Sequence, residues 1–235
     1  MILLILGIGI ISVLIFIYFQ PLFAVRWLAG RNARVLYFVD TKAKVVALTI
    51  DDAPHPIVTP RILDVLKEYS AHATFFLIGR NIKGNEHLLN RMRRDGHELG
   101  NHLSEDAASI RLSSEEFEHQ LLEVDKMINP DGPQKWFRPG SGFYNNRMLK
   151  QAEAHGYRCA LGSVYPHDTI VRSTWIISTF ITNKIFPGAI IVIHEGKKDR
   201  IRSVEVLKRV LPELQRLGYK VVTVSQLIAV EPSSS

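Results

Sequence analysis

Short apolar runs alternate along most of the chain with longer segments in which apolar residues recur every three or four positions. The short runs are typical of buried strands and the longer periodic segments of amphipathic helices. The predicted strands are Val35–Val39, Val45–Ile50, Ala73–Ile78, Glu98–Asn101, Trp136–Arg138, Cys159–Val164, Ala189–His194 and Lys220–Val224. The predicted helices are Thr59–Tyr69, Glu86–Asp95, Ser113–Ile128, Asn146–His155, Thr174–Lys184 and Ser203–Leu217. This alternation predicts one α/β unit from about Arg34 to Val230, built on a parallel sheet that is open or closed into a barrel.

An apolar segment without charged side chains opens the chain, from Met1 to Val25. Its most apolar part, residues 2–19, would span about 27 Å as a helix, which is close to the thickness of a bilayer's hydrocarbon core. A helix of a soluble protein would normally have a polar face, and this segment has none. Residues 1–25 are therefore predicted to form an uncleaved transmembrane or signal-anchor helix. A juxtamembrane segment with the first strand follows over 26–40, then the main domain over 41–230 and a tail over 231–235.

Composition excludes several classes of protein. The 235 residues are 46% apolar and 22% charged, which is ordinary for a globular chain and excludes a disordered or coiled-coil protein. A single long apolar run excludes a polytopic membrane protein. The only cysteine, Cys159, excludes an internal disulfide and a thiolate zinc cluster. The net charge of +6 is modest, and no nucleic-acid partner is predicted.

Polar residues stand at the ends of the predicted strands, where parallel α/β folds form their sites. Asp51 and Asp52 close an apolar strand. Adjacent carboxylates resist ionising together unless a cation lies beside them, so one can bind a metal ion while the other acts as a base. His102 and Asp106, four residues apart, are a donor pair that suits zinc. A turn or helix cap at Asp51-Asp52, and a surface pair at His102 and Asp106, are the alternatives.

Two further strand ends have the same character. Arg138 leaves a short aromatic strand into a Pro-Gly-Ser-Gly loop, where a guanidinium can orient a carboxylate and glycines let backbone N–H groups approach a ligand. His194 ends a wholly apolar strand, a position where an imidazole costs desolvation unless it is used. A plain turn and a satisfied core histidine are the alternatives. His97 is expected to make a structural hydrogen bond.

Taken in order from about Val45 to Leu227, these four sites resemble the motifs of the polysaccharide deacetylase family, the fourth carbohydrate esterase family with its NodB-homology domain. The resemblance implies a distorted parallel (β/α) barrel of about seven strands in the α/β class, which makes 41–230 the catalytic domain. It also implies hydrolysis of an N-acetyl group by one divalent metal ion, most simply Zn²⁺.

The resemblance also assigns roles. Asp51 matches the catalytic base, His194 the catalytic acid, Arg138 the arginine that orients the base, and Asp168 the carboxylate that tunes the acid. The metal ligands would be Asp52, His102 and Asp106. The backbone around Ser141 and Gly142 would contact the substrate and stabilise the oxyanion.

The sequence departs from the family pattern at several of these positions. Asp106 stands where the family usually has a second histidine, and Gly140 and Ser141 replace a proline and an aromatic residue. Thr169 replaces the tryptophan that usually follows the aspartate of the fourth motif. A carboxylate can bind zinc, so an Asp-His-Asp site remains chemically reasonable.

The predicted reaction is the release of acetate from an N-acetylglucosamine-type glycan, such as chitin, a chito-oligosaccharide or peptidoglycan. Three alternatives stay open: a glycan-binding pseudoenzyme of the same fold, an amidase acting on a non-sugar C–N bond, and a membrane-tethered structural protein. The last of these leaves the polar strand ends unexplained.

Two observations favour opposite orientations of the predicted single-pass helix. Arg26, Arg31 and Arg34 follow the apolar run, which by the positive-inside rule favours a cytoplasmic domain. The glycan polymers implied by the resemblance lie mostly beyond the plasma membrane or in the secretory lumen, and long domains can translocate despite flanking charges. We therefore expect the catalytic domain to be extracytoplasmic.

Overall fold

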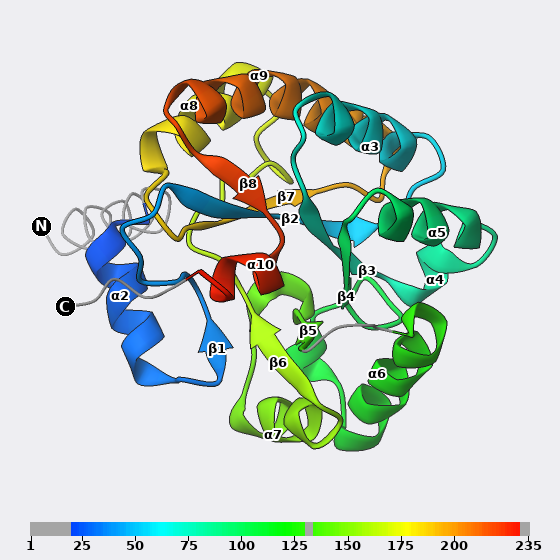
Figure 1. Cartoon of the computed structure of the whole chain (residues 1–235). Helices are drawn as coiled ribbons and strands as arrows, with labels where there is room; N and C mark the ends of the chain where they lie inside the picture. Colours follow the sequence, from blue (N-terminus) through cyan, green and yellow to red (C-terminus); the bar gives the residue numbers. More distant parts are fainter. Residues whose placement is uncertain (1–19, 130–133, 231–235) are drawn as a thin grey trace, which may run out of the picture.

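A ring of helices surrounds a curved parallel sheet in the computed structural model, which describes residues 20–129 and 134–230 (Figure 1). The strands of the described part are β1 (Val35–Leu36), β2 (Val45–Ala53), β3 (Ala73–Leu77), β4 (Glu98–Asn101), β5 (Lys135–Phe137), β6 (Tyr157–Ala160), β7 (Ile190–His194) and β8 (Lys220–Val222). Their order is β1-β6-β5-β4-β3-β2-β7, with β8 paired to the start of β2, and every strand pairing is parallel.

Helices follow most strands, as βα units require. The α-helices are α2 (Leu22–Arg31), α3 (Val58–Glu68), α4 (Gly79–Ile82), α5 (Glu86–Arg94), α6 (Ser114–Ile128), α7 (Asn146–Ala154), α8 (Thr174–Lys184), α9 (Arg202–Arg216) and α10 (Val224–Ile228). The described residues also form three short 3₁₀ turns, η1 (Ser109–Arg111), η2 (Gly140–Gly142) and η3 (Lys198–Ile201). The barrel-like parallel α/β architecture is therefore as predicted.

The segment that follows β6 crosses to β7, which is the edge strand at the other end of the sheet from β1. Val164 forms an isolated parallel bridge with Ile191, and the N–H groups of Ser163 and Val164 donate to the Ile190 carbonyl. The predicted strand Cys159–Val164 was placed too late, because β6 already ends at Ala160. Gly162 then passes close to β7, where an added Cβ would lie 2.4 Å from a Val192 methyl group.

Several predicted helix ends are confirmed. Ser113 and Glu116 form the complete capping box of α6. Gly96, Gly156 and Gly218 follow α5, α7 and α9 with φ near +80° (+80°, +79° and +81°). The first and last strands are shorter than predicted, because the chain leaves the sheet after Leu36 and Val222.

Residues 2–19, on which the membrane prediction depends, lie outside the described residues. Among the residues that are described, none of the helices is long and apolar enough to cross a bilayer. The described part begins just before α2, which spans Leu22–Arg31 and so crosses the predicted boundary at Val25. Pro21 precedes this helix, in the place where its fixed backbone angle suits a helix start.

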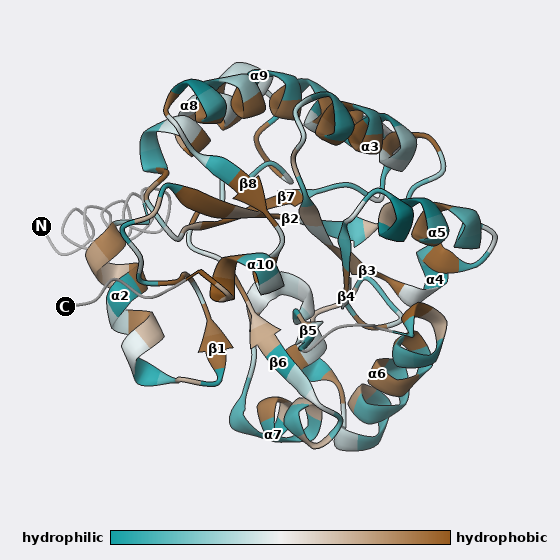
Figure 2. Cartoon of the chain, in the orientation of Figure 1, coloured by the Kyte–Doolittle hydropathy of each residue, from teal (hydrophilic) through white to brown (hydrophobic). Residues whose placement is uncertain are grey.

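The alternation of side chains along β2 separates two apolar layers. Val46, Leu48 and Ile50 point outward into the cluster shared with the helices, whereas Ala47 points inward. Figure 2 shows the same division on the helices, whose brown positions gather on the sides that face the sheet. Because strand side chains alternate, Thr49 and Asp51 continue the inward row that Ala47 begins.

One end of the barrel interior is closed by apolar residues. Trp136 and Phe76 are fully buried there, and Val224 and Leu227 of α10 pack into the same cluster. The Trp136 indole N–H donates to Ser225 of α10 at 2.8 Å. The polar inward positions therefore lie toward the other end, where the strands finish.

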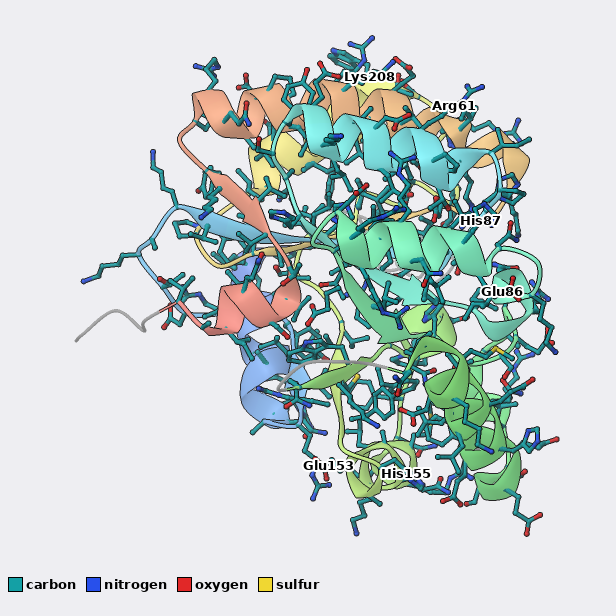
Figure 3. The ribbon with its side chains drawn as sticks, turned by 45° about the vertical axis from the view of Figure 1, so that its right-hand side comes forward. Arg61, Glu86, His87, Glu153, His155 and Lys208 are labelled. Carbon is teal, nitrogen blue, oxygen red and sulfur yellow. The ribbon has the colours of Figure 1, made fainter. Side chains whose placement is uncertain are left out.

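The outer faces of the helices are charged and exposed. Figure 3 labels six residues of this layer, from α3, α5, α7 with its C-cap, and α9: Arg61, Glu86, His87, Glu153, His155 and Lys208. His87 is exposed and His155 Nε2 lies 2.7 Å from a Glu118 carboxylate oxygen. Both histidines belong to the outer helix layer and not to the barrel interior.

His97, in contrast, is buried between β3 and α5. Its Nδ1 accepts the Ala73 N–H at 3.2 Å, which confirms the predicted structural hydrogen bond. Burial, assisted by the neighbouring His72, lowers the pKa of His97 to about 4. The ring is therefore neutral at physiological pH.

We expect His97 to make the folded state sensitive to acid. The unfolded imidazole has a pKa near 6.5, above the folded value, so protons bind the unfolded chain first. The contribution to stability is complete above about pH 6.5 and is lost toward pH 4, at up to about 1.4 kcal/mol per pH unit. In His97→Asn an amide oxygen can accept the same N–H without titrating. Urea unfolding between about pH 7 and about pH 5 should then show a smaller loss of stability than in the wild type.

The exposed His87→Asn variant is the matched control for this experiment and should lose stability as steeply as the wild type. An unchanged pH slope in His97→Asn would contradict the assignment.

Candidate active site

Inward-facing residues from four strands meet at the carboxyl ends of the barrel. Asp51 and His194 are register partners on β2 and β7, so their side chains emerge side by side. His102 and Arg138 each follow a strand end, and Asn101 of β4 pairs with Phe137 of β5 directly before them. All four line a cavity of about 510 Å³, together with Asp52, Asp106, Ser141, Gly142, Tyr165 and Arg200, among others.

Asp51 is held by a buried guanidinium. Arg138 Nη1 donates to Asp51 Oδ1 at 2.5 Å and to the hydroxyl of Thr49 at 2.7 Å. Arg138 Nε donates to the Ala160 carbonyl at 2.8 Å, so the guanidinium is fixed from two sides. Burial works to raise the pKa of Asp51, but the charges of Arg138, His102 and His194 outweigh it and lower that pKa. Asp51 is therefore an ionised carboxylate, as a base must be.

His194 is held by Asp168. Its Nδ1–H donates to Asp168 Oδ1 at 2.9 Å, and its backbone N–H donates to Oδ2 at 2.8 Å. Burial alone would lower the pKa of His194, but Asp168 and Asp51 more than compensate and raise that pKa above its ordinary value. Nε2 faces Asp51 Oδ2 at 3.9 Å. The imidazolium is thus stabilised with its free nitrogen toward the base.

Asp52 is turned into the cavity by an irregularity in β2. The register with β3 shifts between Asp51 and Ala53, and Asp52 adopts φ +66°, in the left-handed region. This irregularity brings two successive carboxylates to the same side of the strand, which regular alternation would prevent. The sequence pattern marks both residues but not the bulge.

The hydrogen-bond partner of His102 shows which of its ring nitrogens carries the proton. Nδ1 lies 2.8 Å from the Arg138 carbonyl and must donate to it, because a carbonyl only accepts. Nε2 then faces Asp52 Oδ1 at 3.5 Å. These two atoms are the start of a donor set for a metal ion.

The third predicted ligand is not part of that set. Asp106 Oδ2 lies 3.6 Å from Arg80 and 3.8 Å from Lys197, and Asp106 is exposed. The other oxygen of Asp52 accepts from the Arg200 guanidinium. Within the described ranges no group of three His, Cys, Asp or Glu side chains could hold a metal ion. As they are arranged here, the described residues do not fit the predicted three-ligand zinc site.

The loop that contains Ser141 and Gly142 lines the cavity. Both residues have positive φ, +63° and +70°. The Gly142 N–H donates to the Pro139 carbonyl at 3.1 Å and the Gly140 N–H to the Ser109 hydroxyl at 2.7 Å. These two N–H groups are engaged within the protein, so the predicted oxyanion contact can come only from Ser141 in this turn. A side chain at Gly140 would meet the Ala107 carbonyl 2.1 Å away, which explains why a proline does not fit there.

Two buried ionisable residues next to Asp52 and His194 have no counterpart among the predicted ones. Arg200, in η3, pairs with Asp52, and Glu195 accepts the Thr59 hydroxyl at 2.7 Å. Burial, with the nearby Asp52 charge, raises the pKa of Glu195 to about 8. Glu195 directly follows His194 in the sequence, and Arg200 belongs to the basic stretch Lys197-Lys198-Asp199-Arg200 that follows the same strand end.

Comparison with known proteins places this fold and site in a class. The sequence model of polysaccharide deacetylases matches residues 38–160. A peptidoglycan-N-acetylglucosamine deacetylase of Bacillus cereus is 35% identical over 202 residues, covering 83% of this chain and 92% of the relative. A chitooligosaccharide deacetylase of Bradyrhizobium is 31% identical over 223 residues, covering 89% and 98%.

Solved structures agree in fold. A crystal structure of a peptidoglycan N-acetylglucosamine deacetylase superposes with a TM-score of 0.78 at 27% identity, covering 86% of this chain and 95% of that one. The fold and its strand-end site define a hydrolase of carbon–nitrogen bonds in N-acetylated glycans. The chain belongs to the polysaccharide deacetylase family.

Two other neighbours bear on the metal question. A family 4 acetyl xylan esterase of Clostridium thermocellum was solved with a cobalt ion (TM-score 0.73, 26% identity, covering 80% and 91%). A family 4 pseudoenzyme of Bacillus anthracis is equally similar in fold (TM-score 0.74, 31% identity, covering 83% and 68%). The structurally similar proteins therefore include both a metal-bound enzyme and a pseudoenzyme, so similarity alone does not decide whether this chain binds a metal ion.

Proposed function

We propose that this chain removes N-acetyl groups from N-acetylglucosamine-type glycans and releases acetate. The observation that supports this most directly is that two buried ion pairs face each other at the cavity. One is Asp51 with Arg138 and the other is His194 with Asp168, and His194 Nε2 lies 3.9 Å from Asp51 Oδ2. One pair holds a carboxylate that can accept a proton, and the other holds an imidazolium that can donate one. Hydrolysis of an amide needs both.

The chain's own residues account for the proton transfers. Asp51 takes a proton from a water molecule, whose oxygen adds to the acetyl carbon. The tetrahedral intermediate collapses as the carbon–nitrogen bond breaks and His194 Nε2 gives its proton to the leaving nitrogen. Acetate and a free amino sugar are the products, and Asp51 and His194 return to their starting states by exchange with water. The Ser141 backbone N–H is the candidate donor for the acetyl oxygen in this turn.

Acetate release tests the proposal. Purified protein should release acetate from at least one member of a panel of chito-oligosaccharides, chitin and peptidoglycan, and the same preparation of Asp51→Asn should not. Each assay is run with and without chelator. Sugar binding without acetate release across the panel would favour the pseudoenzyme alternative. The pseudoenzyme of Bacillus anthracis is an example of this class with a similar fold. Release from small cyclic amides alone would favour the amidase.

We further propose that the domain acts outside the cytoplasm, tethered by the apolar residues 2–19. The support for this orientation is the substrate class of the family, since glycan polymers lie mostly outside the cytoplasm. The flanking Arg26, Arg31 and Arg34 favour the opposite orientation, but long domains can translocate despite such charges. Protease treatment of intact cells should cleave the domain without permeabilisation. Protection until the membrane is opened would place it in the cytoplasm or an internal lumen.

A further inference from the structure

The segment that follows β7 places a cation on each of two carboxylates that were expected to bind a metal ion. Arg200 pairs with Asp52 and Lys197 lies 3.8 Å from Asp106. Both cations come from the four residues Lys197 to Arg200.

The Arg200 pairing is built into the site rather than attached to its surface. The side chains of Asp52 and Arg200 are each only 10% exposed. Arg200 Nη1 also donates to the Glu195 carbonyl at 2.8 Å, which fixes the guanidinium against the loop. Gly196 lets that loop pass directly over Asp52, since a Cβ there would lie 2.5 Å from the Asp52 carbonyl oxygen.

The charges of the site balance without a further cation. Asp51 has Arg138, and Asp52 has Arg200. A guanidinium does not lose its proton in proteins, so it neutralises Asp52 at every relevant pH. A divalent ion on the other oxygen of Asp52 would stand beside this fixed positive charge, in a buried place where repulsion between cations is strong. It would also find Asp106 beside two cations, with Arg80 at 3.6 Å and Lys197 at 3.8 Å.

We infer that Arg200 is the resident cation of this site and takes the place that a divalent metal ion would have on Asp52. The inference rests on the proposed function in one respect: the guanidinium lines the cavity and so is placed to meet the acetyl oxygen of a bound substrate. Guanidinium groups stabilise developing negative charge on oxygen when they are fixed before the reaction. Arg200 is thus a candidate electrophile, and its relation to Asp52 can be measured without any substrate.

Metal titration of the full chain tests the inference. Calorimetric titration of the purified protein with Zn²⁺, and the visible spectrum with Co²⁺, should show weak binding in the wild type. Arg200→Gln frees Asp52 and should bind either ion at least about tenfold more tightly, since a tenfold change needs only about 1.4 kcal/mol. Arg200→Lys keeps the positive charge, so its metal affinity should stay as low as that of the wild type. A comparison of the two variants therefore separates the effect of losing the charge from the effect of replacing the arginine side chain.

Arg91→Gln is the matched control, because Arg91 is also an arginine paired with carboxylates, those of Asp64 and Asp95, but on the outer helix layer. It should leave metal affinity unchanged. One tightly bound ion per wild-type chain, lost in Asp52→Asn, would overturn the inference, as would equal affinity in wild type and Arg200→Gln.

Acetate release by the wild type should persist in chelator and fall in Arg200→Gln. If no glycan in the panel is deacetylated, the proposed function fails while the metal titration still decides the role of Arg200.

Discussion

Asp51→Asn is expected to lower turnover on an N-acetylated glycan by roughly 10²–10⁴-fold, the usual contribution of a general base. The substitution is nearly isosteric, and the amide oxygen can still accept the Arg138 hydrogen bond that Asp51 Oδ1 accepts now. What disappears is the ability to take a proton from water. Initial rates of acetate release, with substrate concentrations spanning KM, would show the loss in kcat.

The same substitution leaves the buried Arg138 charge without its counter-ion, so stability must be measured in parallel. Arg138 keeps its hydrogen bonds to Thr49 and to the carbonyls of Ala160 and Leu161, which should hold the fold. Asp125→Asn is the matched control: Asp125 is also paired with a cation, Lys135 at 2.9 Å, but outside the cavity. It should cost stability without lowering turnover of the folded fraction. Near-normal turnover in Asp51→Asn would overturn the assignment of the base.

The positions of Asp51, Arg138 and His194 could be predicted from the sequence because one physical rule places them. Each ends a short apolar strand, and the carboxyl ends of parallel strands meet at one edge. The period of two along β2 and β7 then points Asp51 and His194 inward on neighbouring strands. Asp168 was found only through the family resemblance, since it lies in a loop with no periodic pattern.

The neighbourhood of Asp52 could not be predicted in the same way. Arg200 lies 148 positions away along the chain, in a 3₁₀ turn, and reaches Asp52 only because Gly196 lets the loop cross it. The four-residue spacing of His102 and Asp106 would bring the two side chains together on a helix, but the chain there is not helical: His102 follows β4, and the first turn after it, η1, begins at Ser109. A spacing argument holds only when the element that it assumes is formed.

Short elements were the other part of the fold that the pattern missed. α4, α10 and the 3₁₀ turns are too brief for a helical period to show. α10 nevertheless closes one end of the barrel through Val224 and Leu227. The longer helices α6 and α9 have apolar positions that recur over several turns, and their extents were predicted to within a few residues.

His194→Asn is the variant that separates the acid from the base. Its amide N–H can still donate to Asp168 in place of the imidazole Nδ1–H, so the local structure should be kept. The variant has no proton to give to a leaving nitrogen, and deacetylation of a glycan should fall by roughly 10²–10⁴-fold. An aryl acetate such as 4-nitrophenyl acetate has a leaving group that departs without protonation. Its hydrolysis should therefore fall by less than about tenfold in His194→Asn, but by the full factor in Asp51→Asn.

The pH dependence gives this prediction a second readout. Asp51, with its lowered pKa, must be ionised, so activity rises as pH increases through the pKa of that carboxyl. His194, with its raised pKa, must be protonated, so activity on the amide falls as pH increases through the pKa of the imidazole. In His194→Asn this alkaline fall should disappear from the residual activity on the glycan, while the acid limb due to Asp51 remains. Equal losses of His194→Asn on the glycan and on the aryl ester, with the alkaline fall retained, would show that His194 only supports the site and that another group supplies the proton.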